Sequence, residues 1–401
     1  MVSDACPPSS LVQKAQVFRK RCVSVILETN TYKQVKAFID LPGKLYKNDP
    51  QWICTLDSDV QSIFDPTKNN FFNHGVCSRW IAVGAKGDTI GRIAAFIDFK
   101  KTGGCPSPVG GIGFFECIND KELAHQLFRT AKEWLQSKGM KAMDGPINFG
   151  ENDKFWGLLV EGFQSPSYGM NYNPPFYIDF FESYGFEKLY DQYTNVLKVD
   201  NPLPERFTRI SDWVMKKEDY RFEPFSRRHK QKYFHDFQEV YNDAWYGFEN
   251  FVPIEMETIR ESFRQMEPIM DERIIWFAYY QDSPIAFILC LPDVNQLLKP
   301  LHGKMHLLNK LRFVWYKKTT TIERIRIIVM GCKQKFQNHG IESALIRCLQ
   351  NEVLPRKTVR EVELAWVGDF NKKMMALHEA TGAVRSKVHR TYRYHFEKAE
   401  G

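Results

Sequence analysis

The strongest constraint on the fold is a short pattern that occurs once in each half of the chain. The Glu-x-x-Gly sequence at residues 182–185 returns at residues 379–382, which is 197 positions later. Each copy follows an apolar segment with helical spacing and precedes an aromatic-rich strand. Between the halves, residues 199–204 contain two prolines, which end a strand and stiffen a connection. A chain of 401 residues exceeds the roughly 250–300 residues that one core supports. We therefore expect two related domains, residues 1–200 and 201–401.

Segments with strand and helix periods alternate in both halves, and this order predicts the fold class. Turn sequences such as Lys86-Gly87-Asp88 join neighbouring strands into hairpins. Strands joined by helices predict an α/β fold in which each domain is a mixed, twisted sheet flanked by helices. The expected strands are residues 22–27, 79–84, 89–99, 113–117, 220–225, 273–280, 285–291, 322–330, 362–367 and 384–396. The expected helices are residues 31–47, 120–137, 230–245, 340–353 and 371–381.

The composition excludes several classes of protein. Hydrophobic residues make up 43% and charged residues 26%, which is typical of a globular chain rather than a disordered or fibrous one. No apolar run approaches the ~20 residues that span a bilayer, and residues 1–10 are polar without an apolar signal segment. Nine scattered cysteines without a C-x-x-C pair indicate reduced thiols and no metal site. These features favour a cytoplasmic location.

The stretch from residue 327 to residue 341 is the first candidate for chemistry. An apolar strand ends, a short polar loop follows, and Gly340 opens a helix. Backbone N–H groups at a helix N-terminus bind anions, and a glycine there lets a phosphate approach the backbone closely. Lys333 and Lys335 add positive charge. The alternative interpretation is a basic loop in front of an ordinary helix.

The order strand, Gln337-x-x-Gly340, helix, strand and a helix from Asn371 to Gly382 resembles the second half of the GCN5-related N-acetyltransferase (GNAT) superfamily. Residues 145–148 and 172–176 of the first half resemble a group of bacterial tandem GNAT-like proteins. Some relatives of that group are thought to N-acylate long-chain amino alcohols. The resemblance therefore implies an N-acyltransferase with two tandem GNAT-like lobes.

In this family a loop after the fourth strand holds the pyrophosphate of coenzyme A (CoA). The resemblance implies acetyl-CoA or a longer acyl-CoA as co-substrate, with no metal. A backbone N–H near residues 329–331 would hold the thioester oxygen. The residues implied in CoA binding are Val329, Met330, Gly331, Lys333, Lys335, Gln337, Asn338, His339, Gly340, Ile341 and Asn371.

Acyl transfer to an amine needs a base for the amine and an acid for the departing thiolate. Glu363, on the strand after the loop helix, is the candidate base, and the alternative is a carboxylate at the rim. His378 stands where the family has its acidic tyrosine, and Tyr392 is a second candidate acid. Asp293 and Asn295 follow another core strand, where they would bind the acceptor or cap the next helix.

Two features weigh against a direct transfer of the family's properties. Glu342 replaces the last small residue of the family's loop, and its carboxylate would repel a phosphate if it points inward. The first half lacks the loop sequence and has Glu116 and Asp120 at the matching junction. We therefore expect no CoA site in the first lobe, which would shape the acceptor side or support the second lobe. A GNAT-fold binding or scaffold protein without catalysis is the alternative function.

A basic segment precedes the strand that leads to the loop. Residues 299–326 contain eight Lys or Arg and one acid, in a chain whose net charge is +7. Within residues 297–318, a helix would gather leucines, a valine and a tryptophan into one stripe with lysines at its margins. Either this stripe packs on the core, or it contacts a membrane surface peripherally, at the inner face. The resemblance implies a small-molecule or lipid amine as the partner. Nucleic acid is not favoured because no binding motif accompanies the charge, and nothing indicates the oligomeric state.

Overall fold

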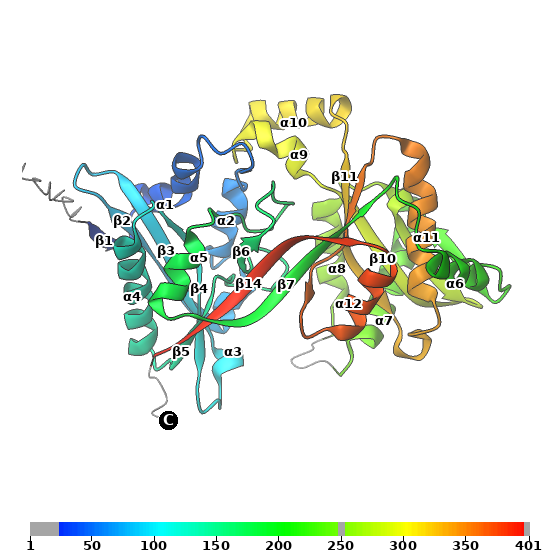
Figure 1. Ribbon diagram of the computed structural model, residues 1–401, viewed down its shortest axis with the longest axis horizontal. Coiled ribbons are helices and arrows are strands. Elements are labelled where there is room, and N and C mark those ends of the chain that lie inside the picture. The colour runs from blue at the N-terminus through cyan, green and yellow to red at the C-terminus, as the bar shows by residue number, and fades with distance from the viewer. Residues whose placement is uncertain (1–23, 248–252, 397–401) are drawn as a thin grey trace, which may run out of the picture.

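The computed structural model describes residues 24–247 and 253–396, and it forms two lobes that share one sheet (Figure 1). The predicted polar N-terminus, residues 1–10, and the first two residues of the predicted strand 22–27 lie outside the described part. The sheet order is β1-β2-β3-β4-β5-β14-β7-β12-β11-β10-β9-β8, with β6 beside β14 and β13 beside β7. This arrangement confirms the expected α/β fold, with a mixed sheet flanked by helices.

The strands and helices of the first half come in the order expected from the sequence. Its strands are β1 (Val25–Glu28), β2 (Gly75–Val83), β3 (Thr89–Asp98), β4 (Val109–Cys117), β5 (Ala142–Gly145), β6 (Leu158–Glu161) and β7 (Glu187–Lys198). Its helices are α1 (Tyr32–Leu45), α2 (Asp57–Ile63), α3 (Phe99–Thr102), α4 (Lys121–Ser137) and α5 (Tyr177–Tyr184).

The second half repeats this order, with an insertion of residues 294–322 between its third and fourth strands. Its strands are β8 (Tyr220–Pro224), β9 (Ile275–Tyr280), β10 (Ser283–Pro292), β11 (Arg324–Cys332), β12 (Glu361–Glu363), β13 (Val367–Gly368) and β14 (Val384–His395). Its helices are α6 (Glu205–Met215), α7 (Lys230–Trp245), α8 (Met256–Met266), α9 (Asn295–Leu298), α10 (Leu307–Thr319), α11 (Ile341–Val353) and α12 (Lys372–Ala380). Short 3₁₀ helices are η1 (Asn70–Asn73), η2 (Arg227–His229), η3 (Glu272–Ile274), η4 (Lys299–Leu301), η5 (Gln334–Phe336) and η6 (Leu354–Arg356).

The two halves exchange their closing strands. β7 belongs to the first half by sequence, yet it pairs with β12 of the second half, and β14 pairs with β5 of the first half. β7 and β14 also pair with each other in antiparallel register from Val196 opposite Val384 to Glu187 opposite Arg393. These two long strands cross the centre of the molecule in Figure 1. The boundary at residue 200 therefore separates the halves along the chain, but not the lobes in space.

Each lobe has its own apolar clusters, which cover both faces of the sheet. In the first lobe α4 and α5 pack on β2–β4, and Asp120 caps α4 by accepting a hydrogen bond from the Leu123 N–H (3.1 Å). In the second lobe α6 and α11 pack on β9–β11, whereas α7 and α8 cover the opposite face. No helix in the described ranges combines the length and the apolar character that crossing a bilayer requires.

Candidate functional site

β11 and β12 separate in the middle of the second lobe, and this opening is the candidate site. They pair in parallel only where Arg324–Arg326 lie opposite Glu361–Glu363, and β11 then continues to Cys332. On the other side of β11, Leu289 and Cys290 lie opposite Val329 and Ile327, so Ile328 forms a bulge. Within the described strands, none pairs with β11 beyond Arg326 on the β12 side. This stretch of β11, residues 327–330, therefore has no strand partner on the β12 side.

The predicted CoA residues Val329, Met330 and Gly331 lie along this unpaired edge. Val329 and Met330 are half-buried, and a Cβ on Gly331 would lie 2.8 Å from the Trp245 ring of α7. The opposite face of β11 is thus closed by α7. Backbone N–H groups of this segment are the donors that could hold a thioester oxygen.

The predicted anion loop lies between β11 and α11 and is held by contacts with β11 and α7. The Gln337 side chain donates to the Cys332 carbonyl (3.2 Å), and the Gln334 N–H donates to Asp243 of α7 (2.7 Å). The α11 helix begins at Ile341 with no side-chain cap on its N-terminus. Uncapped first-turn N–H groups are the feature that an anion site needs.

Gly340 is required by the fold, whether or not the loop binds a ligand. Its φ of +82° lies in the left-handed region, which favours glycine. A Cβ there would also lie 2.7 Å from Ile210 and 3.1 Å from Val214 of α6. The glycine therefore lets α6 pack beside the start of α11, so its presence alone does not identify a phosphate site.

The charges around the loop differ from what the sequence suggested. Lys333 forms an ion pair with Glu239 of α7, so its charge is partly neutralised. Lys335, Asn338 and His339 are exposed on the loop. Lys335 is thus the loop cation that is accessible to an anionic ligand.

Glu342 lies in the first turn of α11, where an anion would bind. Burial raises the pKa of this carboxyl, while its own backbone N–H and His339 act in the opposite direction. The side chain therefore uses a donor at the helix N-terminus and carries negative charge there above its pKa. This is the strongest structural obstacle to a pyrophosphate at the loop.

The candidate acid His378 faces β7 from α12. It is 6% exposed, and burial lowers the pKa of its ring to about 4. The Asn195 side-chain N–H donates to its Nδ1 (2.9 Å), which leaves the ring proton on Nε2. A neutral imidazole is a weak acid at pH 7, so this environment weighs against His378 as the proton donor.

The other predicted residues of this group are spread over both lobes. Asn371 caps α12 by accepting a hydrogen bond from the Met374 N–H (3.1 Å). Tyr392 lies in the core of the first lobe, where its hydroxyl donates to Glu182 (3.0 Å). The structure therefore does not bring Tyr392 to the loop after β11.

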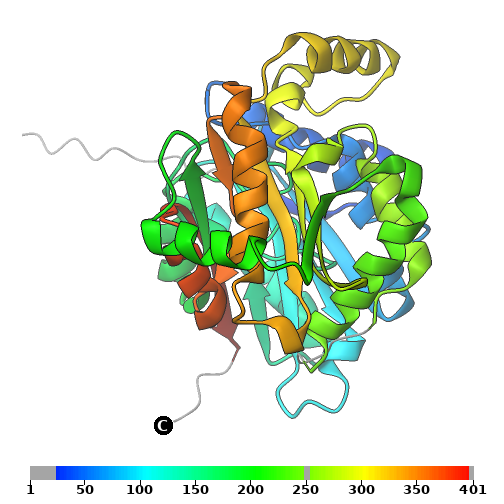
Figure 2. The same ribbon diagram turned by 90° about the vertical axis from the view of Figure 1, so that its right-hand side faces the viewer.

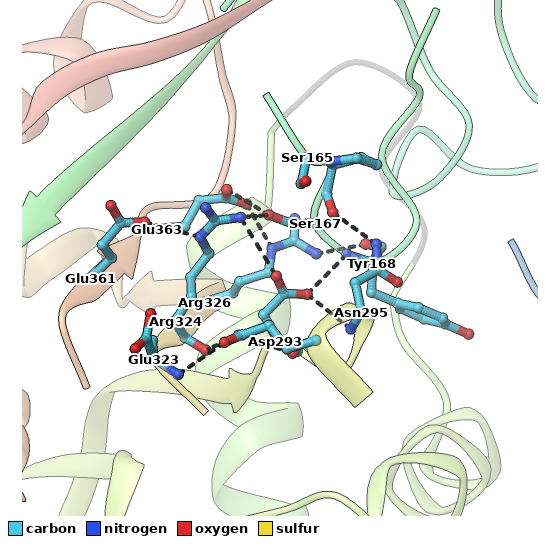
Figure 3. Close-up of polar contacts among 12 residues, drawn as sticks. Ser165, Ser167, Tyr168, Asp293, Asn295, Glu323, Arg324, Arg326, Glu361 and Glu363 are labelled. Atoms are coloured by element: carbon cyan, nitrogen blue, oxygen red, sulfur yellow. Dashed lines mark hydrogen bonds and ion pairs between the residues drawn. The ribbon is translucent and has the colours of Figure 1, made fainter. Parts of the chain in front are cut away.

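Glu363, the candidate base, lies in a buried ionic network at the lobe junction (Figure 3). It is 1% exposed, pairs with Arg326 (2.8 Å) and Lys387 (3.2 Å), and accepts a hydrogen bond from the Ser167 hydroxyl (2.6 Å). Although burial opposes it, the charges of Lys387 and Arg326 hold the pKa of Glu363 at about 2. A carboxylate with so low a pKa is a poor general base, and the network favours a structural role.

Asp293 and Asn295 belong to the same junction and bind the loop of residues 165–168. The Asn295 side chain donates to the Pro166 carbonyl (2.8 Å), and the Tyr168 N–H donates to Asp293 (3.2 Å). Asp293 also pairs with Arg324 (3.6 Å), and burial raises the pKa of its carboxyl. Because these groups are satisfied within the protein, their geometry favours joining the lobes over binding an acceptor.

The matching junction of the first lobe is closed. The Ile147 N–H donates to the Ile112 carbonyl (2.8 Å), so the chain after β5 stays beside β4 where β11 and β12 part. The Asp120 side chain caps α4, and Glu116 is buried beside Arg92 (3.6 Å). The cavity between the end of β4 and residues 146–173 has a volume of only 90 Å³. This is smaller than the roughly 300–1,000 Å³ of drug-sized ligand pockets.

Sequence reasoning missed several residues that shape these sites. Asn195 fixes the His378 ring, and Ser167, Arg326 and Lys387 surround Glu363. Lys387 is a lysine in an alternating strand, a position that normally indicates a solvated face. Only the exchange of β14 between the lobes makes that position buried. Among the described residues, no group of three or more His, Cys, Asp or Glu side chains could hold a metal ion.

We predict that Glu342→Gln strengthens CoA binding at neutral pH. A like charge ~4 Å from a phosphate costs about 1 kcal/mol in water, or about fivefold in affinity. Because the carboxyl pKa is raised, the wild type loses affinity as the pH rises through that pKa, and the variant does not. Calorimetric titration across this pH range measures the difference. Glu352→Gln, in the last turns of the same helix, is the control and leaves the affinity unchanged.

We also predict one CoA per chain. The first-lobe junction is closed by the continuation of β5 and carries the Asp120 cap, so it offers no donors for a second pyrophosphate. Calorimetric saturation should therefore occur at one equivalent. Saturation at two equivalents would contradict the closed junction of the first lobe.

The network around Glu363 predicts a strong effect on stability. Glu363→Gln leaves Arg326 and Lys387 buried without their carboxylate, which costs about 3–5 kcal/mol. The half-buried Glu361, changed to Gln, is the control and costs at most about 1 kcal/mol. The contribution of Glu363 is present above the ordinary carboxyl pKa of 4.5 and is lost as the pH falls towards about 2. Urea unfolding at several pH values checks whether the difference from wild type shrinks in this window.

Comparison with known proteins bears on the fold and on the relatives of the chain. No family model matches the sequence. The chain is 27% identical over 382 residues to the bacterial ceramide synthase of Caulobacter vibrioides, covering 92% of this chain and 96% of that protein. It is 28% identical over 364 residues to Protein YghO of Escherichia coli, covering 89% and 92%.

Solved structures of GNAT proteins, one of them a tandem GNAT protein, superpose on most of the described chain. A tandem GNAT protein from the clavulanic acid biosynthesis pathway matches with a TM-score of 0.54 and 11% identity, over 94% of this chain and 99% of that one. A GCN5-related N-acetyltransferase from Sphaerobacter thermophilus matches with a TM-score of 0.51 and 11% identity, over 94% and 96%. The chain therefore has the tandem GNAT fold, and over nearly its whole length it is similar to a bacterial ceramide synthase.

Proposed function

We propose that the protein is an acyl-CoA-dependent N-acyltransferase whose acceptor is a long-chain amine. The observation that carries this proposal is the opening between β11 and β12, with the bulge at Ile328 and an uncapped helix N-terminus at its end. Such an opening presents backbone donors first to a thioester and then to a pyrophosphate. The similarity to a ceramide synthase over 96% of that relative supports a lipid amine as acceptor.

The reaction makes modest demands on the side chains. The amine nitrogen attacks the thioester carbonyl, a C–N bond forms, the C–S bond breaks, and the amine proton ends on the thiol. In the proposed site, backbone N–H groups of residues 327–330 stabilise the oxyanion, and the loop amides with Lys335 hold the pyrophosphate. The predicted acids and bases His378, Glu363 and Tyr392 are each held by contacts within the protein, so the proposed site relies on backbone donors rather than on these side chains.

A second candidate function is supported by two specific observations. Glu342 places a carboxylate at the helix N-terminus, and His378 is neutral and buried where the family has a tyrosine. Both features suit a GNAT-fold protein that binds a ligand or partner without transferring an acyl group. The two functions differ in turnover, because only the transferase releases thiol from an acyl-CoA.

The test is the release of free thiol from acyl-CoAs of increasing chain length, each mixed with short amines or long-chain amino alcohols. The proposal expects thiol release that depends on the amine and an N-acyl product of matching mass. Lys335→Glu should raise the KM for acyl-CoA about fivefold or more with little effect on kcat, because an exposed charge near phosphate contributes about 1 kcal/mol. Lys86→Glu, in the exposed first-lobe turn, is the matched control and should behave as wild type.

The outcome also decides between the two functions. CoA binding without thiol release across the whole panel would favour the non-catalytic binding protein. Absence of both binding and release would contradict the assignment of the loop after β11. Release with short amines alone would keep the acyltransferase and exclude the lipid acceptor.

A further inference from the structure

The α10 helix presents its apolar side to solvent. Leu307, Leu308, Leu311, Val314 and Trp315 are 74%, 65%, 62%, 53% and 59% exposed. At helical spacing these five residues form a single stripe. The helix lies at the edge of the molecule, above the junction of the two lobes, in Figures 1 and 2. The sequence left open whether this stripe packs on the core, and the structure places it outside.

The opposite side of α10 holds the helix in place without the stripe. Asn309 is buried, and its side chain donates to the carbonyls of Leu301 (3.1 Å) and Lys304 (2.8 Å). Phe313 and Tyr316 pack on the small cluster formed by Val294, Leu298 and Leu301. The fold of the insertion therefore does not need the exposed leucines and tryptophan, so packing within the chain gives no reason for them.

The insertion is fixed to both lobes. The Lys299 side chain donates to the Pro50 carbonyl (2.7 Å), and the Asp57 N–H donates to the Gly303 carbonyl (2.8 Å). Asn295, at the base of the insertion, bonds Pro166 at the lobe junction. A surface that bound the stripe would therefore hold the whole molecule in one orientation.

The charge of the insertion is positive and uncompensated. Residues 294–322 contain six Lys or Arg and no Asp or Glu. Lys299, Arg312 and Lys317 make their hydrogen bonds to neutral carbonyl or amide oxygens. Lys304 acts on Asp57 only at longer range. Within the described residues, no ion pair joins any of the six cations to an acidic side chain, so the positive field beside the stripe is open to a partner.

We propose that α10 docks the protein on an anionic lipid surface, with the stripe among the acyl chains and its lysines at the headgroups. An apolar stripe with tryptophan, flanked by cations, matches both layers of such a surface. A second copy of the chain matches less well, because it would bring another six uncompensated cations to the contact. A nucleic acid would satisfy the cations but leave the stripe in water.

This docking deepens the proposed function. It rests on that function in one respect only, namely that the acceptor is a lipid of the same membrane. The docking itself requires no turnover. It can therefore be tested by binding in the absence of acyl-CoA, and its failure is distinguishable from failure of the transferase.

The experiment is co-sedimentation of the full chain with vesicles of phosphatidylcholine, alone or with phosphatidylglycerol, at low and high salt. We expect binding to the anionic vesicles at low salt that weakens as salt rises. The double variant Lys310→Glu with Lys318→Glu should bind at least tenfold more weakly, because each cation near the surface contributes about fivefold. Leu311→Ala with Trp315→Ala should lose binding even at low salt.

The matched control lies on α6, where Trp213 is 59% exposed, as Trp315 is. Trp213→Ala with Lys216→Glu removes the same two kinds of side chain from another face and should leave vesicle binding unchanged. If all three double variants bind alike, or if wild type does not bind anionic vesicles at low salt, the docking proposal is overturned. A dimer in solution that Leu311→Ala with Trp315→Ala dissociates would also overturn it, since the stripe would then bind a second copy.

The vesicle-binding and acyl-transfer experiments together distinguish the two proposals. Vesicle binding through α10 without acyl transfer in the amine panel retains the docking and rejects the transferase. Acyl transfer to a detergent-solubilised amine without vesicle binding retains the transferase and rejects the docking.

Discussion

The antiparallel pairing of β7 with β14 is the interaction on which the rest of the structure depends. Each strand completes the sheet of the lobe to which it does not belong by sequence. The backbone hydrogen bonds of these strands thus join the halves into one sheet, and side chains of both halves meet on its face. Arg326 and Glu363 already face each other across the ladder of β11 and β12, and Lys387 of β14 and Ser167 of the first half join them at the junction. Separating the lobes would expose those charges and break the central ladder at once.

This junction is polar, and burying polar groups there costs free energy. Several buried side-chain atoms on β7 and β14 have no hydrogen-bond partner among the described residues, including those of Gln192, Thr194, His389 and Thr391. A junction made of apolar side chains would be as easy to bury, and it would not leave polar groups without hydrogen bonds. A fully paired carboxylate such as Glu363, however, accepts only the register that supplies its three donors. We infer that the polar seam fixes the strand register between two lobes with similar alternation.

The sequence predicted the elements of the fold better than their assembly. Helices such as α7 and α11 have a strong apolar period and clear ends, so their bounds were predicted closely. The exchange of β7 and β14 leaves no such signal, because the same alternation suits pairing within a lobe. For that reason the sequence predicted Glu363 as the base, with a rim carboxylate as the alternative, and Tyr392 as a second candidate acid. The sequence explained Gly340 by a bound phosphate. Nothing in the local sequence indicates that a Cβ at this position would lie 2.7 Å from Ile210 of α6.

The eight basic residues between residues 299 and 326 illustrate why composition alone could not divide structure from function. Two of them, Arg324 and Arg326, are taken into the lobe junction and neutralised by Glu361, Asp293 and Glu363. The other six lie on the insertion and face neutral oxygens or water. In the sequence the two groups look like one basic segment, because Glu323 is the only acidic residue between residues 299 and 326. Because buried charge without a partner is expensive, the paired arginines explain how the lobes hold together. The unpaired lysines, kept beside an exposed apolar stripe, contribute nothing comparable to folding, and their charge remains available to an anionic surface outside the chain.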